Sequence, residues 1–95
     1  MKDPEFTEAK KTVIDNLHTI QQSLVVCVDE GMVDQGAAYY NELLDLIDDA
    51  HLISTWEELH EIITLAQTLE VDVAAWHAFH GRTSLSLSWP RARSV

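Results

Sequence analysis

The densest group of side chains able to do chemistry lies in residues 56–62, WEELHEI. This segment holds the carboxylates of Glu57, Glu58 and Glu61 and the imidazole of His60. Carboxylates that converge on one point can hold Mg²⁺, whereas carboxylates spread over the water-facing side of a helix are only surface charges. The first question is therefore which way these side chains face.

The apolar residues that follow predict a helix with these acids on its outer side. From Leu59 to His80 they recur at alternating intervals of three and four residues, which is the pattern of one buried helix stripe. At about 100° per residue, Glu57 and Glu61 point well away from that stripe and Glu58 flanks it. We therefore interpret Glu57 and Glu61 as solvated charges near a helix N-terminus, where Glu57 and Glu58 also complement the helix dipole.

The alternative is a catalytic Mg²⁺ site formed by Glu57, Glu58 and Glu61. Their E-E-x-x-E spacing resembles the first acidic motif of the all-α nucleotide pyrophosphohydrolases, and residues 65–76 are similar to the apolar segment after that family's second motif. The resemblance implies inward carboxylates that hold Mg²⁺ on a nucleoside triphosphate. The family's second motif, E-x-x-D, follows the first, but here the only E-x-x-D spans residues 42–45 and precedes it.

The histidines offer a second alternative, a site for Zn²⁺ or Ni²⁺. His77 and His80 lie three residues apart on or beside the third stripe, and His51 ends the second stripe. Together with Asp48 and Glu58 they would supply imidazole and carboxylate ligands for a transition metal. The structural interpretation is that these histidines end helices and bond to carbonyls or carboxylates.

The charge distribution argues against phosphate-rich partners. Net charge is −10, and the segment from Thr12 to Gly81 holds thirteen acids and no Lys or Arg. A protein grips a phosphate backbone with Lys and Arg, so we expect neither nucleic acid nor an anionic membrane surface as a partner. An acidic surface suits a basic protein partner.

Residues 65–82 are also comparable to a repressor-type helix-turn-helix. Glu70 stands at the turn, where that motif usually has glycine. The segment that would read DNA, residues 73–80, offers no Arg, Lys, Asn or Gln to base edges. DNA binding is therefore not predicted.

The apolar periodicity predicts three helices, over about residues 6–30, 34–51 and 54–80. The third begins with a capping box in which the Ser54 side chain accepts from the amide of Glu57, and Glu57 returns to the Ser54 amide. The alternative is a break at residues 70–72, with Asp72 capping a short fourth helix over residues 73–80.

These elements predict an all-α fold, a three-helix antiparallel bundle that completes its core by homodimerisation and carries an extended C-terminal tail. Residues 1–6 read as a cloning remnant, because DPEF resembles translated restriction sites. Residues 7–81 form the acidic helical domain. Residues 82–95 form a basic tail whose leucines alternate with serines, which is strand-like, and we expect it to dock on the acidic body of its own chain or of a neighbour.

The sequence favours association over catalysis. It has no nucleophile–base pair, no Gly-rich phosphate loop and no strong metal motif, so no cofactor is predicted. It has no signal peptide or membrane-spanning run, so we expect a cytoplasmic protein. We expect a homodimer that also binds a basic protein partner. The predicted interface combines large aromatic side chains with cations of the tail: Tyr39, Tyr40, Trp76, Phe79, Trp89, Arg91 and Arg93.

Overall fold

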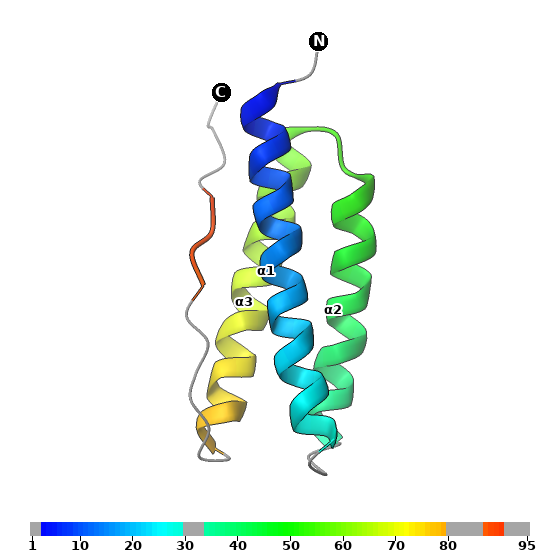
Figure 1. The fold of residues 1–95 in the computed structure, drawn as a ribbon, viewed down its shortest axis with the longest axis vertical. Coiled ribbons are helices and arrows are strands. Elements are labelled where there is room, and N and C mark those ends of the chain that lie inside the picture. Colours follow the sequence, from blue (N-terminus) through cyan, green and yellow to red (C-terminus); the bar gives the residue numbers. More distant parts are fainter. Residues whose placement is uncertain (1–2, 30–33, 80–86, 91–95) are drawn as a thin grey trace.

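The computed structural model describes residues 3–29, 34–79 and 87–90, with the side chains of residues 26–29 and 34–37 left out. The described chain has three helices, α1 (Pro4–Asp29), α2 (Asp34–Leu52) and α3 (Trp56–Phe79), and no strand. The helices lie side by side along the longest axis of the molecule (Figure 1). The predicted all-α fold with three helices is confirmed.

Helix α1 begins with residues that the sequence interpretation had set aside. The Asp3 carboxylate accepts a hydrogen bond from the amide of Glu5 at 2.9 Å, so Asp3 is the N-cap. Pro4 follows as the first helical residue, where its lack of an N–H costs nothing. The Phe6 ring then packs edge-on against Trp56, with 5.4 Å between the ring centroids. Residues 3–6 are therefore part of the folded body.

The inner faces of all three helices meet in one hydrophobic core. On α1 the buried positions step by three or four residues, as expected for a helix that packs with one face. Burying a single Val, Leu or Ile side chain contributes about 1.5–3 kcal/mol to stability. The buried apolar side chains are Ala9, Val13, Leu17, Ile20, Leu24, Leu43, Leu46, Ile47, Ala50, Ile53, Leu59, Ile62, Ile63, Ala66, Leu69, Val73 and Trp76.

The cap of α3 lies one residue later than predicted. The Thr55 hydroxyl, not that of Ser54, accepts from the amide of Glu58 at 3.2 Å. The carboxylate of Glu58, not that of Glu57, accepts a hydrogen bond from the Ser54 amide at 3.3 Å. Ser54 and Thr55 both offer a capping hydroxyl, and the buried Ile53 before them fixes where the helix can start. The sequence pattern could not distinguish the two registers.

The predicted alternative of a break at residues 70–72 is wrong, because α3 runs without interruption to Phe79. Leu69 and Val73, on either side of those residues, are both buried. The inner stripe therefore continues through the segment, and core packing keeps it helical despite the β-branched Val71 and the exposed Asp72.

Residues 87–90 do not form the strand that their alternation suggests, since they have no regular secondary structure. We call them the strap. The strap lies beside α3 (Figure 1), and Leu87 and Trp89 pack against the core of their own chain. The side-chain amide of Asn16 on α1 donates to the Ser88 carbonyl at 2.7 Å. The tail therefore docks, over these residues, on its own body.

Candidate functional site

The carboxylates of residues 56–62 are exposed on the surface of α3. Glu57, Glu58 and Glu61 are all exposed on α3, and Glu58 is committed to the helix cap. Within the described ranges, no three His, Cys, Asp or Glu side chains are grouped so that they would hold a metal ion. The interpretation of these acids as surface charges agrees with their exposure, and the catalytic alternative finds no convergent geometry here.

Glu58 has a structural task instead. The Thr55 hydroxyl donates to its carboxylate at 2.9 Å. That bond is the main cause that lowers the pKa of Glu58 below the ordinary value of 4.5, followed by the Ser54 amide, and the positive charge of Lys10 adds a smaller effect. Hydrogen bonds to a carboxylate favour its charged form. Glu58 is therefore ionised at neutral pH and caps the N-terminus of α3.

The histidines lie at opposite ends of the helical body. The carbonyl of His51 bonds to Lys10 near the start of α1, whereas the ring of His77 lies 3.3 Å from the Ser23 hydroxyl near its end. Lys10 and Ser23 are thirteen residues apart on one helix, so the two histidines are separated by roughly 20 Å. Asp48 is exposed, and His80 lies outside the described residues.

His77 is a core histidine, with 3% of its surface exposed. The Ser23 hydroxyl donates its one hydrogen to the Ile20 carbonyl at 2.9 Å, so it accepts from the His77 Nε2–H group. The ring of Trp76 lies beside the imidazole, with 5.5 Å between centroids. This environment gives His77 a packing role in the core.

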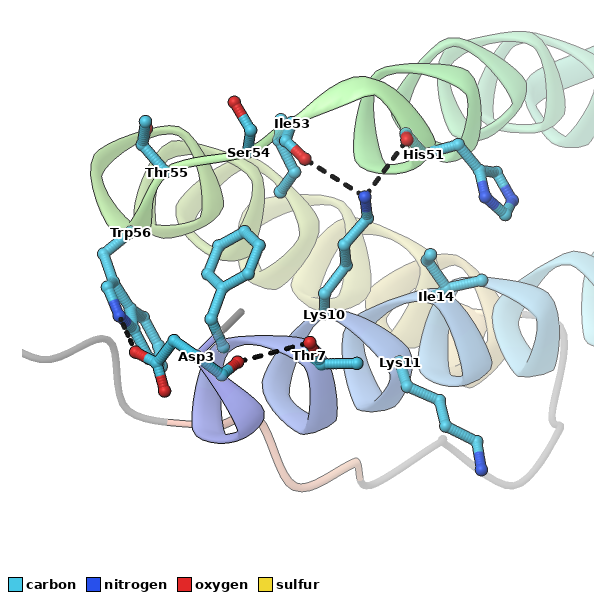
Figure 2. Close-up of a pocket in the computed structure, with 11 residues that line it drawn as sticks. Asp3, Thr7, Lys10, Lys11, Ile14, His51, Ile53, Ser54, Thr55 and Trp56 are labelled. Carbon is cyan, nitrogen blue, oxygen red and sulfur yellow. Dashed lines mark hydrogen bonds between the residues drawn. The ribbon is translucent and has the colours of Figure 1, made fainter. Parts of the chain in front are cut away.

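An open cleft of about 900 Å³ lies where α1 passes the turn between α2 and α3 (Figure 2). Lys10 reaches across it and donates to the carbonyls of His51 at 3.1 Å and Ile53 at 3.0 Å. At the other side of the cleft the Trp56 indole donates to Asp3 at 3.0 Å. A lysine near a helix C-terminus satisfies its last carbonyls and its negative dipole end.

The sequence analysis missed this cleft and the role of Lys10. The only signal was that two lysines stand at residues 10 and 11, at the edge of a long segment without cations. Lys10 is occupied by the end of α2, and Lys11 points away from it (Figure 2). The hydrogen bonds at this cleft therefore hold α1 against the turn between α2 and α3.

The predicted interface aromatics fall into two groups. Tyr39 and Trp76 face each other edge-on, with centroids 6.1 Å apart, and the Tyr40 hydroxyl accepts from Gln21 at 3.4 Å. These rings bind the helices of one chain together. By contrast, 85% of the Phe79 side chain is exposed. Arg91 and Arg93 lie outside the described residues.

Phe79 belongs to an exposed surface that we call the outer face of α3. Its members lie on the side of α3 opposite the buried stripe, from Leu65 to the end of the helix, and all are exposed. They are Leu65, Thr68, Val71, Asp72, Ala75, Ala78 and Phe79. Among these members only Asp72 is charged, and Glu57 and Glu61 lie on the same side nearer the start of the helix. An apolar helix face that remains open to water is typical of an interaction surface.

The strap covers a second surface, made of the parts of α1 and α3 that it contacts, and we call this surface the groove between α1 and α3. The Trp89 indole donates to Glu70 Oε1 on α3 at 3.4 Å. The other carboxylate oxygen of Glu70, Oε2, is buried and has no hydrogen-bond partner in the described part of the chain. This groove therefore binds an extended segment and holds one polar atom that the segment does not satisfy.

None of the three helices, over their described residues, is long and apolar enough to cross a membrane. Comparisons with family models, curated proteins and solved structures found no match to this chain.

Proposed function

We propose that this protein acts by association and forms a homodimer through the outer face of α3. The observation that carries the proposal is the character of this surface. Leu65, Val71 and Phe79 are 55%, 65% and 85% exposed on one helix. Alanines at positions 75 and 78 leave room for another helix to approach closely.

Electrostatics support a second copy as the occupant of this surface. Two chains of charge −10 repel each other wherever their acids face across an interface. The outer face of α3 carries one charge, so two copies can meet there with the least repulsion. A two-fold arrangement would bury the same surface on both chains.

Sedimentation velocity tests the homodimer. We expect the wild-type protein to sediment as a dimer, and a double change of Val71→Glu and Phe79→Glu to give monomers, because four buried carboxylates would face each other. Leu52→Glu is the matched control, since Leu52 is as exposed as Phe79 but ends α2. A wild-type monomer at high protein concentration would refute the dimer, and an unaltered dimer in the double variant would refute the outer face of α3 as its interface.

A basic protein partner is the second proposed association, and it is supported by a different surface. The outer face of α2 exposes Asp45, Asp48 and Asp49, with Glu42 beside them. No Lys or Arg lies in the sequence between Thr12 and Gly81 to neutralise them. Such a surface attracts a basic partner and speeds its encounter, an effect that falls with added salt.

A further inference from the structure

The strap sits in its groove in the manner of a bound peptide. Leu87 and Trp89 pack against the core, while Ser88 between them is exposed. This alternation is how an extended segment presents every second side chain to one surface. Asn16 donates a hydrogen bond to the backbone carbonyl of Ser88, and Glu70 accepts one from the side chain of Trp89. The groove therefore recognises an extended chain through two apolar contacts and two polar ones.

The strap is held by few bonds. Only two hydrogen bonds join it to α1 and α3 within the described residues, and the one to Glu70 is long, at 3.4 Å. Leu87, Trp89 and Pro90 are each only partly buried. A segment with few buried contacts and no backbone ladder opens more easily than the helices it covers.

Glu70 is incompletely satisfied by this occupant. An indole has one N–H, so Trp89 can serve Oε1 and leaves the buried Oε2 without a donor. A buried carboxylate oxygen without a hydrogen bond is costly. An arginine guanidinium presents two parallel N–H groups that match both oxygens of a carboxylate. Lysine offers a point charge and does not match this fork.

We propose that the groove between α1 and α3 is a binding site for an extended, arginine-bearing segment of a basic partner, which takes the place of the strap. The arginine replaces Trp89 and pairs with both carboxylate oxygens of Glu70. An apolar residue two positions before it fills the place of Leu87. This inference rests on the proposed association with a basic partner and gives that partner a site.

Fluorescence polarisation with short labelled peptides tests the site on the full-length protein. The probes repeat residues 84–90 with arginine or with lysine in the position of Trp89. We expect the arginine peptide to bind about tenfold more tightly than the lysine peptide, because only arginine satisfies both oxygens. We also expect Trp89→Ala to strengthen binding of the arginine peptide, because its own strap competes less well.

Two charge-matched variants locate the contact. Glu70→Gln should weaken binding of the arginine peptide about tenfold, since it removes the bidentate pair. Asp72→Asn removes the same charge from an exposed position on the same helix and should change binding less than about twofold. Circular dichroism confirms that both variants are folded, and the comparison of the two peptides on the wild-type protein needs no variant.

The outcomes separate the two proposals. If both peptides bind equally and Glu70→Gln behaves like Asp72→Asn, the protein attracts basic segments but the groove is not their site. If neither peptide binds, even to the Trp89→Ala variant at low salt, the groove is refuted as the site, and the proposed basic partner would have to bind at the acidic outer face of α2 instead. Neither result bears on the homodimer, which depends on the other side of α3.

Discussion

Helices α2 and α3 pack on the same core, but the solvent-facing side of α2 is acidic and that of α3 is largely apolar from Leu65 onward. The outer face of α2 carries Asp45, Asp48 and Asp49, which is the usual arrangement for an amphipathic helix. The outer face of α3 carries Val71 and Phe79 in the same kind of position. Core packing constrains only inner faces, so it explains neither choice. The difference is the basis for the proposed contact at the outer face of α3.

The largest expected effect is the difference in stability loss between a buried and an exposed leucine of α3. Leu69 is 2% exposed and Leu65 is 55% exposed on the same helix. Leu69→Ala should lower the free energy of unfolding by about 2–5 kcal/mol, because it leaves a cavity. Leu65→Ala should change it by less than about 0.5 kcal/mol in the monomer. Urea unfolding at low protein concentration measures both.

Equal losses for the two leucine variants would contradict the assignment of the outer face. They would mean that Leu65 is buried in the isolated chain. Repeating the measurement at high protein concentration sharpens the test, since an interface at Leu65 makes stability depend on concentration.

A smaller effect is expected at the C-terminal end of α2, where Lys10 bonds to the last carbonyls. Lys10 fastens the end of α2 through the carbonyls of His51 and Ile53. Lys10→Met should cost about 1–3 kcal/mol of stability, because the Ile53 carbonyl loses its donor in a partly buried place and the exposed His51 carbonyl loses the same donor. Lys11→Met is the control and should stay within about 0.5 kcal/mol, since Lys11 is an exposed neighbour. If the two variants unfold at the same temperature, the hydrogen bonds of Lys10 do not contribute to stability as expected.

The smallest effect concerns the start of α3 and depends on pH. Thr55→Ala should cost about 0.5–2 kcal/mol at neutral pH, because it removes the N-cap. The folded state lowers the pKa of Glu58 from its ordinary 4.5, so this carboxylate stabilises the protein above that pH and the contribution is lost as pH falls through the folded pKa. The loss from Thr55→Ala should therefore shrink in acid.

Urea unfolding of the wild type and Thr55→Ala, at neutral pH and below pH 4.5, measures this linkage. Thr64→Ala is a matched control, because Thr64 is an exposed threonine within the same helix. A difference between wild type and Thr55→Ala that stays constant with pH would show that Glu58 and Thr55 are not coupled.

The inner stripes could be predicted from the sequence because they depend only on local periodicity. The spacing from Leu59 to Trp76 predicts which residues of α3 are buried, and those positions are buried in the structure. The same periodicity places Glu57 and Glu61 in water. These predictions need no knowledge of what the helix packs against, because a helix buries one side against any neighbour.

The contacts between distant segments could not be predicted in this way. The bond from Lys10 to Ile53 joins residues 43 positions apart, and the bond from Trp89 to Glu70 joins residues 19 positions apart. The shift of the cap from Ser54 to Thr55 depends on how Ile53 enters the core. In each case tertiary packing selected one of several choices that the local pattern allowed.

The hydrogen bond from the Trp56 indole to Asp3 has a practical consequence for experiments on this protein. The opening residues resemble vector-derived sequence, and trimming them would be a natural first step in preparing a shorter version. That step would remove the N-cap of α1, the Phe6 ring and the acceptor of the Trp56 indole together. A shortened chain would then begin with a frayed helix and a loosened turn, so any melting curve or binding curve recorded on it would describe a different molecule.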